Sequence, residues 1–218
     1  PICAGLAAAT LALFASTALS AQTAPVAPAA ASTQASEDAR LTQFLDAEFA
    51  AYVKTQPQLA TRLGIKDGGD KWNDISDKAA AADVAWRQAS VARMKAQFDR
   101  AKLSPEGQVN YDIWALEADR AALSNKNRVY RPPFYSRLYS LHSQMPDFLI
   151  NTHTVNDVAD LKNYIARLRG MPAVLDLGIA RSKASDKAGI HAPRFQIETI
   201  ISSSQQLTSG APFGPGPD

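Results

Sequence analysis

Side chains suited to substrate recognition concentrate between Asn127 and His142, where the sequence loses any regular hydrophobic period. This segment, NRVYRPPFYSRLYSLH, places arginines among aromatic residues and ends in a histidine. Arginine forms paired hydrogen bonds to carboxylates and tyrosine adds a hydroxyl, so the combination is typical of a site for carboxylate groups and peptide backbone. The residues concerned are Arg128, Tyr130, Arg131, Phe134, Tyr135, Arg137, Tyr139 and His142.

Two other interpretations of this segment stay open. Basic residues with interleaved aromatics also bind single-stranded nucleic acid. Alternatively, the aromatics pack a long loop onto neighbouring helices and the arginines line its rim, which is the more common role of aromatic residues in loops. The formal net charge of +2 is too small to indicate nucleic acid or an anionic membrane, so we predict neither as a partner.

Motifs for other chemistries are absent from the sequence. It contains no glycine-rich phosphate loop, no G-x-S-x-G nucleophile elbow and no H-E-x-x-H zinc helix. His153 and Asp157 lie four residues apart, but their position at a helix entry favours a capping or surface role over metal binding. We therefore predict no catalytic residue, no metal ligand and no cofactor within this chain.

An uncharged, largely apolar segment from Ile2 to Leu19 precedes the first charged residue, Glu37. Its ending, Ala18-Leu19-Ser20, predicts a signal peptide over residues 1–20 with cleavage after Ser20. A membrane anchor is the alternative, since the segment approaches the ~18 to 20 apolar residues that cross a bilayer. No Met and no basic residue precede the apolar segment, so we expect the n-region of the signal to be truncated.

Cleavage of this signal predicts an exported protein, periplasmic or extracellular, without a membrane segment. The single cysteine, Cys3, lies before the apolar centre of the signal. The mature chain would therefore have no disulfide, no catalytic thiolate and no cysteine-bound zinc, and its core alone would hold it together.

The remaining sequence divides into a linker and a helical region. Residues 21–36, AQTAPVAPAAASTQAS, are uncharged and have little to bury, which predicts a disordered tether. Residues 37–218 show helical spacing without strand-like alternation and without an internal repeat. We predict an all-α fold, an irregular array of several helices.

Helix starts are marked by capping residues. Ser36 and Ser76 are each followed by acidic residues, and Ser104-Pro105 joins a capping hydroxyl to a proline at the first helical position. Apolar residues then recur on one face of the helix after Pro105. This stripe consists of Val109, Ile113, Leu116 and Leu123.

Residues 125–153 contain several prolines and predict an irregular loop with one short helix. Asn156 is expected to cap the next helix, a further helix is expected from about Pro172 to Gly189, and the last ends at Gly210. Basic residues fall mostly off the apolar positions of these helices, which predicts a solvated face. They are Lys162, Arg167, Arg169, Arg181, Lys183 and Lys187, and the apolar stripe is Val158, Leu161, Ile165 and Leu168.

Several segments, taken in order, resemble the N-terminal half of the bacterial family called domain of unknown function 885 (DUF885). The most distinctive is Met145-Pro146-Asp147-Phe148-Leu149-Ile150-Asn151 followed by His153. The others are Phe44-Leu45, Leu59-Ala60-Thr61-Arg62-Leu63-Gly64-Ile65, Leu103-Ser104-Pro105-Glu106-Gly107, Tyr164-Ile165-Ala166-Arg167-Leu168 and Gly189-Ile190. The resemblance spans about residues 38–213.

This resemblance implies a longer, mostly helical, exported protein that is similar to zinc metallopeptidases. In such proteins an H-E-x-x-H helix in the C-terminal half supplies zinc ligands and a glutamate that activates water. Zinc is therefore expected in the full-length protein, and no zinc ligand can be carried onto this chain. By analogy with related helical peptidases, the candidate residues for the wall of a substrate cleft are Arg131, Tyr135, Tyr139 and His142.

The leading hypothesis is that this chain is the N-terminal portion of an exported zinc-dependent peptidase and is inactive by itself. The rival is a non-enzymatic helical module that binds peptides or envelope partners. Under the leading hypothesis we expect the C-terminal half to bury the apolar stripes that end at Leu168 and Leu207.

Overall fold

The computed structural model describes residues 28–136 and 138–209, and within these ranges the protein is all helical, with seven α-helices and no strand. The predicted all-α fold is confirmed. The predicted signal peptide and the last residues of the chain lie outside the described ranges. The helices are α1 (Pro28–Val53), α2 (Pro57–Arg62), α3 (Asp77–Gln97), α4 (Pro105–Lys126), α5 (Leu141–Asn151), α6 (Val158–Lys187) and α7 (Arg194–Thr208), with 3-10 turns η1 (Arg100–Lys102) and η2 (Arg128–Tyr130).

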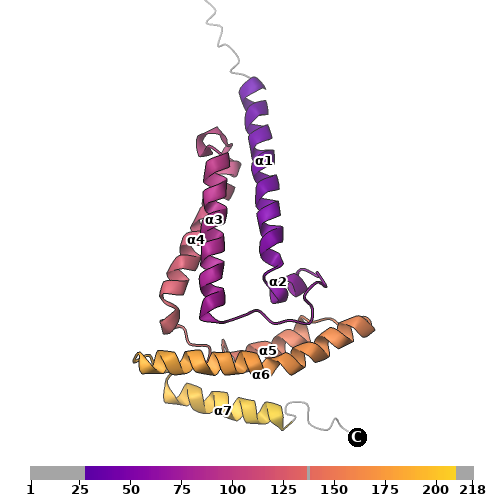
Figure 1. Cartoon of the computed structure of the whole chain (residues 1–218), viewed down its shortest axis with the longest axis vertical. Helices are drawn as coiled ribbons and strands as arrows, with labels where there is room; N and C mark the ends of the chain where they lie inside the picture. The colour runs from indigo at the N-terminus through magenta and orange to yellow at the C-terminus, as the bar shows by residue number, and fades with distance from the viewer. Residues whose placement is uncertain (1–27, 137, 210–218) are drawn as a thin grey trace, which may run out of the picture.

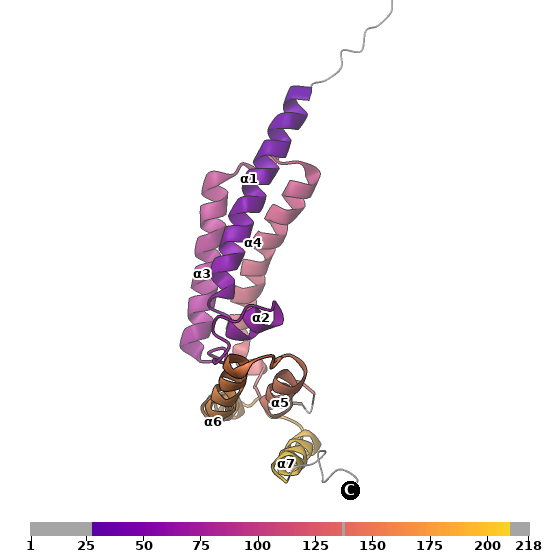
Figure 2. The same ribbon diagram turned by 90° about the vertical axis from the view of Figure 1, so that its right-hand side faces the viewer.

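Three long helices and a crossing helix define the architecture. Helices α1, α3 and α4 run alongside one another, and α6 crosses below their lower ends with α5 beside it (Figures 1 and 2). Helix α7 lies on the far side of α6 from the three long helices (Figure 1). None of the described helices has the length and apolar character needed to cross a membrane.

The first helix begins earlier than the sequence indicates. Helix α1 starts at Pro28, so residues 28–36, which we expected in a disordered linker, are helical, and Ser36 lies inside the helix. The Ser36 hydroxyl donates to the carbonyl of Thr33 at 2.8 Å. The prediction that Ser36 caps this helix is therefore wrong. The alanines near Ser36 have a high helix propensity, which favours helix in this segment although it lacks a charged or apolar face.

Both later serine caps are confirmed. The Ser76 hydroxyl accepts from the N–H of Ala79 at the start of α3. The Ser104 hydroxyl accepts from the N–H of Gly107 at the start of α4, where Pro105 takes the first helical position. Each cap satisfies one of the backbone donors that a helix leaves unpaired at its start.

A hydrophobic core cluster joins helices α1, α3 and α4. Leu41 of α1, Met94 of α3 and Tyr111 of α4 are buried together with Phe98 and Leu103. Phe44 and Phe98 meet edge to face, with ring centroids 5.6 Å apart. This cluster fixes α1 against the α3–α4 pair.

Helix α6 is continuous where two helices were predicted. It runs from Val158 to Lys187 with Pro172 in its interior. Proline removes one backbone hydrogen bond, but the turns on either side supply enough bonds for the helix to continue. The N-cap is Asp157, not Asn156: its carboxylate accepts from the N–H of Asp160 at 2.8 Å.

The end of α6 matches the sequence pattern. Gly189 takes a φ of 80°, a left-handed conformation that side chains other than glycine rarely adopt. The N–H of Ile190 donates to the carbonyl of Ser185 at 3.0 Å, which closes the last turn in a Schellman arrangement. The loop predicted over residues 125–153 is also confirmed, with α5 as its one α-helix.

Leu41→Ala and Leu116→Ala should differ sharply in their effect on stability. Leu41 is 1% exposed in the core, whereas Leu116 on α4 is 45% exposed. We expect Leu41→Ala to lower the free energy of unfolding by about 2–5 kcal/mol through the cavity it leaves, and Leu116→Ala by less than about 1 kcal/mol. Urea unfolding followed by circular dichroism measures both. Equal losses would show that the core has been placed wrongly.

Candidate functional site

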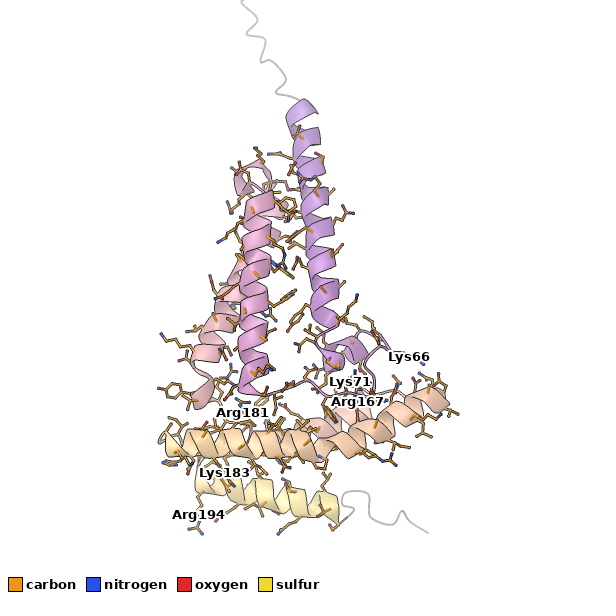
Figure 3. All side chains as sticks on the ribbon, viewed as in Figure 1. Lys66, Lys71, Arg167, Arg181, Lys183 and Arg194 are labelled. Carbon is orange, nitrogen blue, oxygen red and sulfur yellow. The ribbon has the colours of Figure 1, made fainter. Side chains whose placement is uncertain are left out.

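The main candidate binding site lies where α3 begins, α4 ends and α6 passes beneath them. Two adjoining cavities, of about 240 and 630 Å3, share Ala80, Asp83, Arg128 and Arg181 in their walls. The smaller one also includes Arg131. We call these two cavities together the arginine pocket. Figure 3 shows Arg181 on the side of α6 that faces the base of α3, whereas Lys183 lies on the side towards α7.

Arg128 lines the pocket and also holds two parts of the fold together. Its Nε donates to the carboxylate of Asp77 at 2.8 Å, and its Nη2 donates to the carbonyl of Ile75. These bonds tie the turn after α4 to the start of α3. Two donors of Arg128 are therefore used by the fold.

Arg181 and Arg131 are far less engaged. Arg181 has a side chain only 19% exposed, and its nearest carboxylate is that of Asp77 at 3.9 Å, beyond hydrogen-bond distance. Burial lowers the pKa of Arg181, and the nearby charge of Arg128 lowers it further. Arg131 is exposed and donates one long bond, 3.4 Å, to the hydroxyl of Ser124. Among the described residues, both guanidinium groups retain donors for a ligand.

Aromatic side chains form one wall of the larger cavity. Tyr52 of α1 and Trp86 of α3 stack with their ring centroids 5.2 Å apart. The guanidinium of Arg87 lies over the Tyr52 ring at 4.4 Å and pairs with Asp83 at 3.0 Å. The pocket thus combines an arginine-rich end with a larger end that has an aromatic wall beside polar side chains such as Gln56 and Asn73.

The structure does not gather the four predicted substrate-binding residues into one cavity. Arg131 lines the arginine pocket, and the side chains of Tyr135 and Tyr139 are exposed, at 42% and 77%. The ring of His142 lies near that of Phe134, with ring centroids 6.5 Å apart, and burial lowers the pKa of His142. Its Nδ1 has no hydrogen-bond partner within the described part of the chain. Their role in substrate binding stays a prediction.

A second polar cluster, which the sequence did not reveal, surrounds Arg167 of α6. This side chain is fully buried, although we expected it on a solvated face, so that prediction is wrong for Arg167. Its Nε donates to the carbonyl of Lys71 at 2.9 Å, and its Nη2 donates to the hydroxyl of Thr61 at 2.8 Å. Figure 3 shows Arg167 beside Lys71, where the α2–α3 connection meets α6.

Aromatic rings and His153 complete the surroundings of Arg167. Its guanidinium carbon lies 5.0 Å from the ring centre of Phe148 and 5.8 Å from that of Trp72. Trp72 in turn donates from Nε1 to the carbonyl of Arg167 at 2.8 Å. Burial lowers the pKa of Arg167 to about 10, which leaves it charged at neutral pH.

His153 is buried against Arg167, so its predicted surface or capping role is also wrong. Arg167 donates from Nη1 to Nδ1 of His153 at 2.7 Å, which leaves the His153 proton on Nε2, facing the carbonyl of Asp160 at 3.3 Å. Burial is the main cause that lowers the pKa of His153. The bond to Asp160 opposes this shift, and the positive charge of Arg167 adds to it.

Lys66 links this cluster to the start of α6. Its Nζ lies 3.0 Å from the Asp157 carboxylate and 2.9 Å from that of Asp160. The N–H at the head of α6 lowers the pKa of Asp157, and Lys66 lowers the pKa of Asp160. His153 and Asp157 thus have separate structural roles. His153 contacts the buried Arg167, and Asp157 caps the start of α6.

No described residues form a site that fits a metal ion. Within residues 28–136 and 138–209, no group of three or more histidine, cysteine, aspartate or glutamate side chains lies close enough together to hold one. The zinc that the family resemblance implies therefore does not fit the described part of this chain, and no chemical step is derived through it.

Two apolar stripes remain uncovered by the described residues. The predicted stripes on α4 and α6 have the helical spacing read from the sequence, but their side chains are between 38% and 68% exposed. On α7, Phe195, Ile201 and Leu207 are likewise exposed. Contiguous apolar surface of this kind usually marks a contact with another protein segment.

These features define an all-helical protein with an arginine-lined pocket and open apolar faces. The sequence profile described as "Bacterial protein of unknown function (DUF885)" matches residues 57–217, and the chain belongs to this family. No curated protein matches the sequence, and no solved structure matches it.

His153→Gln should reduce the acid sensitivity of the protein. The pKa of His153 is lower in the folded state than its ordinary value of about 6.5. Below about pH 6.5 the unfolded chain therefore binds more protons than the folded chain, and the free energy of unfolding decreases as the pH is lowered. Glutamine can accept from Arg167 and donate to the Asp160 carbonyl without titrating. Unfolding free energies at about pH 7.5 and 5.5 should therefore differ less in the variant than in the wild type.

Arg169→Gln provides the control, because it changes an exposed charged residue on the same helix as Arg167 and removes no histidine. It should keep the wild-type loss of stability on acidification. The half-buried His142 is unchanged in both variants, so its contribution cancels. An equal acid loss in His153→Gln and wild type would contradict the assigned role of His153.

Proposed function

We propose that this chain is the N-terminal helical portion of an exported, zinc-dependent peptidase whose metal-binding half lies further along the polypeptide. The chain belongs to the DUF885 family, and the proposal rests on the resemblance of this family to zinc metallopeptidases that the sequence analysis describes. In this arrangement the present helices form one wall of the substrate cleft and supply no metal ligand.

The observation that carries the proposal is the pair of exposed apolar stripes on α4 and α6. Leu161 and Leu168 are 47% and 45% exposed, although their spacing is that of a core-facing helix. Leaving such a surface in water costs roughly 25 cal/mol per Å2 relative to burial, so a covering segment would gain considerable stability. A following helical portion of the same chain would supply this cover.

The loop before α5 is the part of this chain that we place at the cleft. Arg131 has free donors for a substrate carboxylate, and Tyr135 and Tyr139 present exposed rings and hydroxyls. His142 lies near Phe134 of this loop, with ring centroids 6.5 Å apart. In such an enzyme these side chains would bind and orient a peptide, and the chemistry of hydrolysis would belong to the zinc-bearing half.

The coding sequence beyond Asp218 tests the proposal most directly. We expect an H-E-x-x-H motif within the next few hundred codons, and we expect the longer product to hydrolyse peptides. A chelator should abolish this activity and added zinc should restore it. A stop codon soon after Asp218 would contradict the proposal and favour the rival, a non-enzymatic helical module that binds peptides or envelope partners.

Leu168→Gln tests whether the C-terminal half of the longer protein covers the apolar stripe on α6. In the longer protein it should lower the free energy of unfolding by about 1–3 kcal/mol, because the amide would be buried without a partner. In the present chain the same change should have little effect. The neighbouring exposed residue gives the control, Arg169→Gln, which should be nearly neutral in both chains. If Leu168→Gln changed the free energy of unfolding of the longer protein only slightly, its C-terminal half would not cover this stripe.

A further inference from the structure

We propose that the arginine pocket binds the carboxylate of an amphipathic ligand, with the carboxylate between Arg181 and Arg131 and the apolar part against Trp86 and Tyr52. The chemical class is an N-acylated amino acid or the C-terminal end of a peptide with an apolar last residue. This inference does not depend on peptidase activity, because every group in the site belongs to the present chain.

The charge arrangement favours an anion at the small end of the pocket. Arg181 is mostly buried, forms no hydrogen bond with the described residues and faces the charge of Arg128. A buried guanidinium with free donors is costly unless a partner satisfies it. A carboxylate can accept two parallel N–H bonds from one guanidinium, which suits this position.

Nearby acidic residues neutralise this end only in part. The carboxylate of Asp77 is 81% exposed and bonds to Arg128, and Asp83 bonds to Arg87. Asp74 accepts the N–H of Ser76 at 2.8 Å, which is the main cause that lowers the pKa of Asp74. Asp77 also lies 3.9 Å from Nε of Arg181, so it offsets part of this positive charge without a hydrogen bond, and the donors of Arg181 and Arg131 remain for a ligand.

The large end of the pocket favours an apolar group beside the carboxylate. This cavity measures about 630 Å3, enough for an amino-acid side chain, and Ile75 joins Trp86 and Tyr52 in its wall. It adjoins the arginine end across Ala80 and Arg181. A ligand that spans both ends would pair its carboxylate and bury its side chain at once.

Titration with N-acetylphenylalanine, followed by the indole N–H signals of the three tryptophans, tests the proposal. The Trp86 signal should shift, because this ring lines the pocket. Trp72 and Trp114 should not shift, because their indoles donate to the carbonyl of Arg167 and the hydroxyl of Ser90, outside the pocket. Saturation of the Trp86 shift gives the dissociation constant.

Two other probes separate the parts of the ligand. N-acetylphenylalanine amide lacks the carboxylate, and we expect it to bind about ten- to a hundredfold more weakly. Inorganic phosphate lacks the apolar part and should also bind more weakly than N-acetylphenylalanine. Equal binding of the amide would overturn the proposal, and so would phosphate binding as tight as that of N-acetylphenylalanine.

Arg181→Gln should weaken binding of N-acetylphenylalanine about tenfold or more and leave the circular dichroism spectrum unchanged, since Arg181 holds no hydrogen bond of the described fold. Arg169→Gln, on the same helix but outside both cavities, is the matched control and should bind like the wild type. Should Arg181→Gln disturb folding, the exposed Arg131→Gln gives a second measurement with the same expected direction. Wild-type affinity in a folded arginine variant would overturn the proposal.

Discussion

The buried guanidinium of Arg167 is the interaction on which the lower half of this protein depends. A charged group without solvent must have its donors satisfied, and here the partners come from α2, from the α2–α3 connection and from His153. Within the described residues no carboxylate lies within ion-pair distance of this arginine, so dipoles and aromatic faces stabilise the charge. Separating these segments would leave several buried polar groups unpaired at the same time.

This constraint also positions the arginine pocket. Arg167 and Arg181 are fourteen residues apart on α6, which is close to four helical turns, so both project from nearly the same side of the helix. When Arg167 locks one half of α6 to the α2–α3 connection, Arg181 is brought against the base of α3, roughly 21 Å away along the helix axis. The orientation of α6 therefore determines both the polar cluster around Arg167 and the position of Arg181 in the arginine pocket.

The sequence predicted those features that are encoded locally. The caps at Ser76 and Ser104 and the left-handed Gly189 each depend on residues within one helical turn, and all three are confirmed. The apolar stripes were also read correctly as faces. Periodicity indicates which side chains share a face, however, and it does not indicate which segment covers that face.

The environment of Arg167 could not be read from the sequence for a different reason. Two of its partners are the carbonyl of Lys71 and the hydroxyl of Thr61, about a hundred residues earlier, and a backbone carbonyl leaves no trace in residue type. An arginine off the apolar stripe therefore resembles any solvated arginine. The continuity of α6 through Pro172 was missed because proline usually ends a helix, and here the flanking turns maintain it.

Comparison of Arg167→Met with Arg169→Met by urea unfolding tests the central claim most directly. Both changes remove one guanidinium from α6, but Arg167 is fully buried and Arg169 is exposed. The account predicts that Arg167→Met lowers the free energy of unfolding by at least about 2–3 kcal/mol, because it leaves buried acceptors without donors. It predicts that Arg169→Met changes the free energy by less than about 0.5 kcal/mol. Equal and small effects of the two substitutions would contradict the claim that Arg167 holds this part of the fold together.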